Sequence, residues 1–121
     1  MFLGNWAGCT AHEVFREFEE VNVKSNFNQS KYDGIEILLA YYLYEDYTGL
    51  AFVLFRKDGK LYEVNGSHCS CYGLEGQWDP EETTIEALEH RLEAGYFGKE
   101  YSYNGYTNTF GNELKQILET L

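Results

Sequence analysis

The dipeptide Asp58-Gly59 constrains the fold more than any other feature of the sequence, because it separates two apolar runs. A two-residue type I′ turn needs positive φ at both central positions, and Asp-Gly meets that requirement at low steric cost. Leu50–Phe55 precedes the turn and Lys60–Val64, in which apolar and polar residues alternate, follows it. The sequence therefore predicts an antiparallel β-hairpin over these residues.

A third strand is expected upstream of this hairpin. Gly34–Tyr44 is apolar and aromatic, and a turn over 45–49 connects it to Leu50–Phe55. Leu50–Phe55 is apolar enough to be a central strand that is covered on both faces. We therefore expect three antiparallel strands in sequence order, a β-meander, with no parallel crossover.

Helices are predicted on both sides of these strands. Thr10 and Glu13 form a capping-box pattern at the start of a helix over 10–20. The apolar residues of this helix recur at i, i+3, i+4 and i+7, which places them on one face; they are Ala11, Val14, Phe15 and Phe18. This face is expected to pack on the sheet.

Two more helices are predicted after residue 78. The first is capped by Asp79-Pro80, or by Thr83 with Glu86, and ends near Gly95. The second runs from about Asn112 to the end of the chain, and its cap is Asn108, Thr109 or Asn112. Apolar residues line one face of each helix; they are Ile85, Leu88 and Leu92 in the first, and Leu114, Ile117, Leu118 and Leu121 in the second.

Together these elements predict an α+β fold, a three-stranded antiparallel β-meander with three helices packed mainly on one face. Residues 1–121 are the size of one domain, and a single domain is expected. The expected core consists of Phe15, Phe18, Phe52, Leu54, Leu88 and Ile117. Which of the two alternating residue sets of Leu50–Phe55 faces the helices stays open at this point.

The charge and the cysteine content restrict the classes of function. The net charge of −11 opposes direct nucleic-acid binding and favours a basic or cationic partner. No window has the roughly 18 apolar residues of a membrane span, so no membrane association is expected. Three cysteines are an odd number, which is typical of a reducing cytoplasm rather than of a disulfide framework. The sequence does not indicate an oligomeric state.

Acidic residues follow a helical period in the first helix expected after residue 78. Glu82, Glu86, Glu89 and Glu93 recur at four, three and four residues, so they are expected on one helix face. With Glu13, Glu17 and Glu20 of the N-terminal helix, this face could imitate a phosphate track and occupy a basic cleft. The alternative is a solvated face that keeps the protein soluble, since Arg16, His90 and Arg91 interrupt the stripe.

The segment 68–78 gathers residue types that carry chemistry. It contains two of the three cysteines and one of the two tryptophans, between the third strand and the next expected helix. Loops that rigid elements hold at both ends often carry function. Tyr72 and Trp78 are the aromatic binding candidates of this segment.

A cysteine hydrolase is one enzymatic alternative. Cys9 lies at the expected N-terminus of a helix, where the helix dipole lowers a thiol pKa, and His68 follows a strand. This order of a helix-borne cysteine and a strand-borne histidine resembles the layout of papain-like hydrolases. No family signature surrounds Cys9, and a cysteine beside an apolar helix is commonly a packing residue.

Zinc binding is a structural alternative. Cys9 and His12, together with His68, Cys69 and Cys71, contain the Cys₃His or Cys₂His₂ set that structural zinc uses. The Cys-x-Cys spacing departs from the usual Cys-x₂-Cys, and a core this apolar does not need a metal to fold. No cofactor is therefore expected, with zinc as the alternative.

The stretch Gly49–Leu92 carries a resemblance, above all in the segment HCSCYGLEGQWDPEETT at 68–84. It resembles a set of small uncharacterised proteins encoded by bacteriophages and prophages. The resemblance implies a protein that acts in the cytoplasm of a bacterial cell as an accessory or counter-defence factor. The leading hypothesis is a non-enzymatic protein-binding module that acts as a counter-defence inhibitor or a nucleic-acid mimic, with a basic host or phage protein as its partner.

Overall fold

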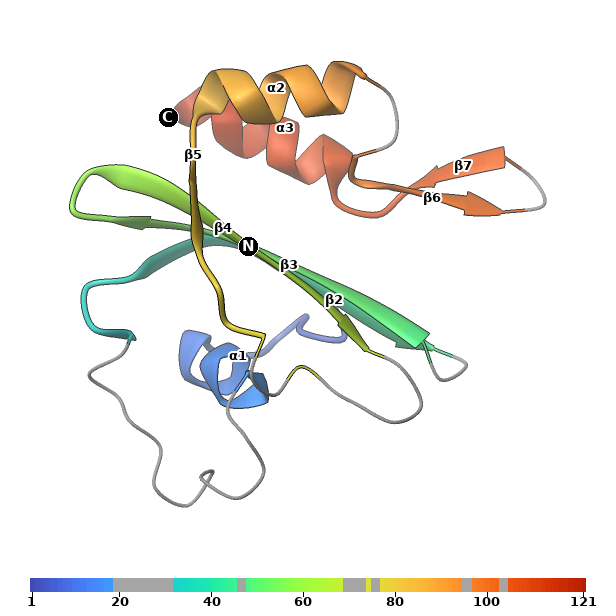
Figure 1. The fold of residues 1–121 in the computed structure, drawn as a ribbon. Helices are drawn as coiled ribbons and strands as arrows, with labels where there is room; N and C mark the ends of the chain where they lie inside the picture. The colour runs from blue at the N-terminus through green and yellow to red at the C-terminus, as the bar shows by residue number, and fades with distance from the viewer. Residues whose placement is uncertain (19–31, 46–47, 69–73, 75–76, 95–96, 103–104) are drawn as a thin grey trace. The chain divides into compact units, whose positions relative to one another are not determined.

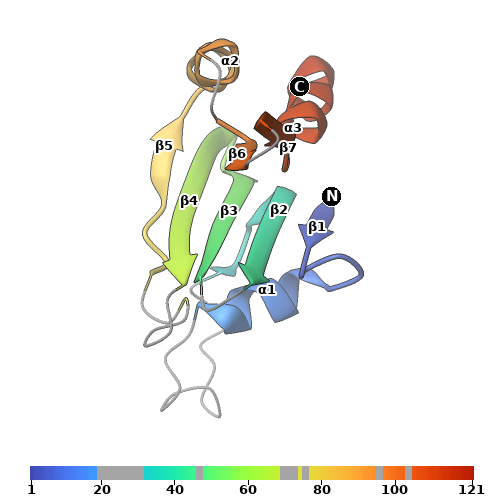
Figure 2. The same ribbon diagram turned by 90° about the vertical axis from the view of Figure 1, so that its right-hand side faces the viewer.

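The computed structural model describes residues 1–18, 32–45, 48–68, 74, 77–94, 97–102 and 105–121. The chain forms two compact units, Met1–Glu82 and Thr83–Leu121, and each is described by itself. Its elements belong to the α+β class, as expected. Figures 1 and 2 show the ribbon from two sides. The expectation of a single domain stays a prediction.

A five-stranded mixed sheet dominates the first unit. Its spatial order follows the sequence order of its strands: β1 (Phe2–Gly4), β2 (Glu36–Glu45), β3 (Thr48–Lys57), β4 (Lys60–His68) and β5 (Glu81–Thr83). The three long strands pair antiparallel, β2 with β3 and β3 with β4. The predicted meander is therefore the centre of the sheet.

The hairpin between β3 and β4 forms around the dipeptide that predicts it. Asp58 has φ of +54° and Gly59 has φ of +78°, the positive values that a type I′ turn needs. Lys57 pairs with Lys60 on either side of the turn. Both strands extend beyond their predicted ends, because backbone pairing continues past the apolar runs.

The prediction of a purely antiparallel three-stranded sheet is wrong at the edges. β1 pairs parallel with β2, with Phe2 opposite Ala40 and Gly4 opposite Tyr42, and β5 adds a fifth strand beside β4. A three-residue strand is too short to show a period of two, so no sequence pattern indicates either edge strand. The helix that lies between β1 and β2 in the chain supplies the crossover that a parallel pair needs.

This helix, α1 (Ala11–Glu17), begins as its capping pattern predicts. The Thr10 hydroxyl oxygen accepts a hydrogen bond from the Glu13 N–H at 3.3 Å, and the helix ends at its C-cap residue Phe18. Sequence periodicity extends the predicted helix to residue 20, and residues 19–20 lie outside the described part of the chain.

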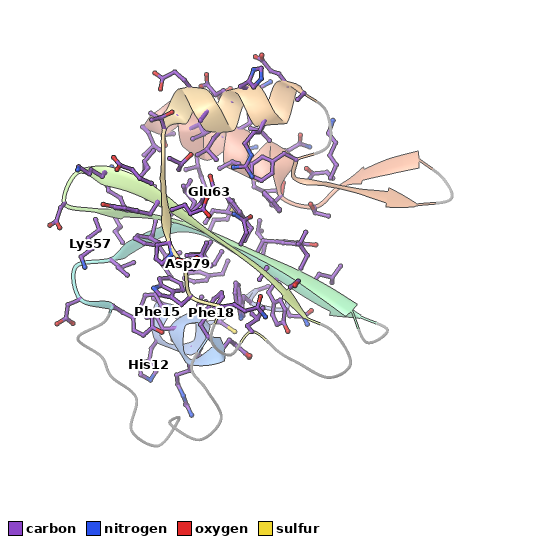
Figure 3. All side chains as sticks on the ribbon, in the orientation of Figure 1. His12, Phe15, Phe18, Lys57, Glu63 and Asp79 are labelled. Atoms are coloured by element: carbon purple, nitrogen blue, oxygen red, sulfur yellow. The ribbon has the colours of Figure 1, made fainter. Side chains whose placement is uncertain are left out.

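The main core of the first unit lies between α1 and one face of the sheet. Val14 of α1 and the C-cap residue Phe18 join a buried cluster with Val53 and Phe55 of β3 and Val64 of β4. Figures 1 and 2 show α1 against the sheet, and Figure 3 shows Phe15 and Phe18 pointing toward it. Val53 and Phe55, rather than Phe52 and Leu54, therefore face α1.

β3 is the central strand that its composition predicts. Each residue from Ala51 to Phe55 is at most 3% exposed, so both faces of the strand are buried. Phe52 and Leu54 lie on the face opposite α1, next to Leu39 and the buried carboxylate of Glu63. The Asn65 side-chain amide donates a hydrogen bond to this carboxylate at 2.8 Å.

The second unit contains two helices and a hairpin. They are α2 (Ile85–Glu93), the antiparallel strands β6 (Lys99–Ser102) and β7 (Gly105–Asn108), and α3 (Gly111–Thr120). The prediction omits this hairpin, although the dipeptide Asn104-Gly105 is a hairpin signal of the same kind as Asp58-Gly59. That all three helices cover one face of the sheet stays a prediction.

The start of α2 corrects the predicted caps. Thr84 is the N-cap, and its hydroxyl oxygen accepts a hydrogen bond from the Ala87 N–H at 3.1 Å. Neither Asp79-Pro80 nor Thr83 has this role, because Glu81–Thr83 is already extended as β5. The predicted C-terminal Gly95 lies outside the described residues, and the structure ends the helix at its C-cap residue Ala94.

None of the three predicted caps is the N-cap of α3, which is Phe110 and makes no side-chain cap hydrogen bond. The Asn108 side-chain oxygen accepts a hydrogen bond from the Asn112 N–H at 2.9 Å. Leu114 and Leu118 are buried, as is Leu88 of α2, whereas Ile117 is only half-buried and Leu121 is exposed. The last residue therefore does not contribute to the apolar face that periodicity assigns to it.

Candidate functional site

The acidic stripe lies only partly on a helix. Glu86, Glu89 and Glu93 are exposed on α2, and their spacing of three and four residues places them on one face. Glu82, the fourth predicted member, lies in β5, two residues before the N-cap of the helix. The prediction that four carboxylates line one helix face is therefore corrected to three.

α2 and α3 pack against each other and run antiparallel (Figure 1). They border a cavity of about 440 Å³, which we call the α2–α3 groove. From α2 the groove is lined by Glu89, Leu92 and Glu93; from α3 by Lys115, Leu118 and Glu119, with the first turn of α3 at one end; and from β6 by Lys99. Two residues of the predicted stripe thus contribute to a concave surface.

The groove combines apolar and charged side chains. Leu92 and Leu118 are its apolar lining, and carboxylates from both helices lie beside them. Within the described residues, the structure records no ion pair for Glu89, Glu93 or Lys115. The carboxylates of Glu89 and Glu93 are therefore available to a bound molecule that carries cationic groups next to an apolar one.

The remaining charged residues of α2 lie differently. Glu86 is exposed and does not line the groove. The Arg91 guanidinium carbon lies 3.9 Å from the ring centroid of Phe97, in a cation–π arrangement. The groove itself takes its positive charge from Lys99 and Lys115, which come from outside α2 and which no pattern in the α2 sequence indicates.

Cys9, the predicted nucleophile, lies in an unfavourable environment for a thiolate. It is half-buried before α1, and its sulfur lies 4.0 Å from the Asn5 carbonyl oxygen. Desolvation raises the pKa of the Cys9 thiol, and the carboxylates of Glu13 and Glu17 raise it further. This direction is opposite to the one that a nucleophilic cysteine requires.

The proposed partners of Cys9 are only partly described. His68 is the last residue of β4, and its side chain, like Cys69 and Cys71, lies outside the described part of the structure. His12 points away from the sheet in Figure 3, whereas Cys9 packs against the core. Among the described residues no group of three metal-ligating side chains converges. The hydrolase and zinc hypotheses both stay predictions.

Described residues of the segment 68–78 pack into the first unit. Leu74 is 1% exposed, and the Trp78 ring contacts Phe15, Phe18 and Phe55 with centroids 5.7, 5.1 and 5.5 Å away. The predicted binding residue Trp78 is thus half-buried in the aromatic core, and Tyr72 lies outside the described residues.

Gln77 is a residue that sequence reasoning misses. Its side-chain oxygen accepts a hydrogen bond from the Ser67 N–H at 2.8 Å, and its side-chain nitrogen donates to the Ser67 carbonyl at 2.7 Å. The side-chain amide of Gln77 therefore makes two hydrogen bonds to the backbone of β4, as the backbone of a neighbouring strand would. No sequence pattern predicts this, because the contact depends on the path of the segment between the two residues.

No helix in the described parts of the chain is long and apolar enough to cross a membrane. Comparison with protein-family models, with curated proteins and with solved structures gives no match. The resemblance to phage and prophage proteins therefore stays a prediction.

Proposed function

We propose that this chain is a non-enzymatic binding module that holds a basic segment of a partner protein in the α2–α3 groove. The observation that carries the proposal is the placement of Glu89, Glu93 and Glu119 around the apolar side chains of Leu92 and Leu118. A segment with Lys or Arg beside an apolar residue matches both properties of this surface. Its cationic groups pair with the carboxylates while its apolar side chain contacts the leucines.

The charge of the whole chain supports a basic partner. A net charge of −11 attracts cationic proteins over distances of about one Debye length, roughly 8–10 Å at physiological salt. The same charge repels nucleic acid, so a direct nucleic-acid ligand is not proposed. Lys99 and Lys115 add an orientation requirement, because a bound segment must keep its cationic groups away from them.

The phage resemblance supplies the proposed setting. The basic partner would be a host or phage protein in a bacterial cytoplasm, and the module would act there as an accessory or counter-defence factor. A nucleic-acid mimic is the second form of the same idea. In that form the partner contacts all exposed carboxylates of the acidic stripe, Glu82 and Glu86 included, and not only those that line the groove.

The experiment compares two double variants with the same change in net charge. Glu89→Lys with Glu93→Lys reverses charge inside the groove, and Glu82→Lys with Glu86→Lys reverses charge outside it. The probe is an amphipathic peptide of Lys and Leu, measured by calorimetry at low and at high salt. The groove variant should bind at least tenfold more weakly and should show a flatter salt dependence.

The control variant separates the two forms of the proposal. If the groove is the site, the outside variant loses only the small long-range part of the attraction. Equal losses in both variants would favour the mimic, in which charge is spread over the surface. Wild-type binding by the groove variant would contradict the proposed function.

A further inference from the structure

A second cavity, of about 300 Å³, lies in the first unit and has a different lining. Its apolar walls are Ile35, Phe55, Tyr62, Trp78 and Pro80. Two charged residues at the β3–β4 turn, Lys57 and Asp58, complete it, and Figure 3 shows Lys57 at that end of the sheet. The volume is at the lower end of the range for small-molecule sites, about 300–1,000 Å³, which suits one compact ring system.

The aromatic side chains of this cavity form a nearly parallel stack. Phe55 stacks on Tyr62 with centroids 5.3 Å apart and planes 20° apart, and on Trp78 at 5.5 Å and 13°. Tyr62 and Trp78 are half-buried, so part of each ring stays open to a ligand. A planar aromatic ligand can extend such a stack, since offset parallel rings attract. A cage for a quaternary ammonium group instead surrounds the cation with several ring faces.

The charges of the cavity favour an anionic substituent on that ring. Lys57 is half-buried whereas Asp58 is exposed, so water screens the carboxylate more than the ammonium group. The neighbouring cation, Arg56, already holds the Glu36 carboxylate with contacts of 2.9 and 3.1 Å. Within the described residues, no ion pair is recorded for Lys57.

We propose that this cavity binds a planar aromatic molecule that carries a carboxylate or phosphate, with its ring extending the stack at Trp78 and its anion at Lys57. Its lining shares no residue with the α2–α3 groove, and the proposal does not depend on the proposed function. Its lining comes from β3, β4 and the residues around Ile35 and Trp78, which the aromatic core already fixes relative to one another.

The chain provides a direct readout, because it contains only two tryptophans. Trp78 lines the cavity, whereas Trp6 is 2% exposed in the core. In a ¹H–¹⁵N spectrum the indole N–H signal of Trp78 should shift on titration while that of Trp6 stays in place. The probes are indole, indole-3-acetate, adenosine 5′-monophosphate and choline.

The variants isolate the charge contact. Lys57→Met should weaken binding of the anionic probes on the order of tenfold and leave indole binding unchanged. Lys60→Met is the matched control, because Lys60 pairs with Lys57 across the turn, is exposed and does not line the cavity. It removes the same charge from the same hairpin, so it reports the long-range effect alone. The other amide signals show whether each variant keeps its fold.

Each outcome supports or contradicts the proposal. A Trp78 shift with indole-3-acetate alone supports a carboxylate ligand, a shift with the nucleotide alone supports a phosphate, and both support the shared chemistry. Indole and indole-3-acetate binding equally well would overturn the anion contact. Choline binding more tightly than every anionic probe, or a Trp78 signal that no probe moves at millimolar concentration, would overturn the site.

Discussion

The carbonyl oxygen of Gly98 accepts a hydrogen bond from the Gly111 N–H at 3.0 Å, and two more from Thr109 and Phe110 at 2.9 and 3.1 Å. One acceptor before β6 thus meets three consecutive N–H groups at the start of α3, which have no partner within that helix. A Cβ atom on Gly98 would lie 2.6 Å from the Gly111 Cα atom. Gly98, directly before β6, is therefore hydrogen-bonded to the residues that lead from β7 into α3.

Replacing Gly98 by alanine should destabilise the second unit. The φ of +78° costs an L residue about 1–2 kcal/mol, and the approach to Gly111 adds a steric cost. Gly59→Ala is the matched control, because Gly59 has the same φ of +78° with no atom within 4 Å of a Cβ. Chemical denaturation should show a larger loss of unfolding free energy for Gly98→Ala. Equal losses would mean that the close approach to Gly111 does not contribute.

Truncation of Phe18 should test whether α1 is part of the core. Phe18 is 1% exposed, and its ring centroid lies 6.0 Å from that of Trp6 and 5.1 Å from that of Trp78. Phe18→Ala should lower the free energy of unfolding by about 3–5 kcal/mol, because it leaves a cavity between α1 and the sheet. Leu50→Ala, at a residue that is 51% exposed, should change it by less than about 0.5 kcal/mol. A loss below about 1 kcal/mol for Phe18→Ala would mean that α1 is peripheral.

Local signals predicted the parts of the fold that local chemistry determines. Asp58-Gly59 indicated the turn because φ there depends on those two residues, and Thr10 with Glu13 indicated the start of α1 because a cap reaches only three residues. Thr83 and Thr84 have the same side chain, so local sequence does not distinguish Thr83, one of the two predicted caps of α2, from the N-cap Thr84. The extended pairing of β5, which decides between them, is not local.

The rest of the fold and of the candidate site depends on contacts between distant segments. Every residue from Ala51 to Phe55 is apolar, so composition could not show which alternating set faces α1. The helical period of Glu86, Glu89 and Glu93 is visible in the sequence of α2 alone. Glu89 and Glu93 line a groove only together with residues of α3 such as Lys115 and Glu119. The packing of the two helices, which the α2 sequence does not indicate, brings these residues together.

Loss of the Gln77 amide should weaken the outer edge of β4. Gln77→Ala removes two hydrogen bonds to Ser67, each worth about 0.5–1.5 kcal/mol. Gln77→Glu keeps an oxygen that accepts from the Ser67 N–H but cannot donate to the Ser67 carbonyl, so it removes only the second of these bonds. Amide hydrogen exchange at Ser67 should therefore become faster in Gln77→Ala than in Gln77→Glu. Gln116→Ala, on the exposed surface of α3, is the control, and unchanged exchange at Ser67 would contradict the pairing.

The reactivity of Cys9 should show the influence of its neighbours on the thiol. The thiolate is the species that alkylating agents modify, and desolvation, Glu13 and Glu17 all raise the pKa of Cys9 above its ordinary value. The thiol form therefore persists at neutral pH, and the alkylation rate should rise only as the pH increases through this raised pKa. The double variant Cys69→Ser with Cys71→Ser leaves Cys9 as the single cysteine, so that the measured alkylation rate belongs to Cys9.

In that background, Glu13→Gln should lower the pKa of Cys9, because it removes both a negative charge and a carboxylate that accepts a hydrogen bond from the thiol. Alkylation at neutral pH should become faster, and the pH profile should move to lower pH. Desolvation and Glu17 remain, so the shift should be partial. Glu86→Gln, in α2, removes the same charge from a residue that does not contribute to the pKa of Cys9. Fast alkylation of the parent at neutral pH, with no response to Glu13→Gln, would contradict this account and would favour the cysteine hydrolase hypothesis.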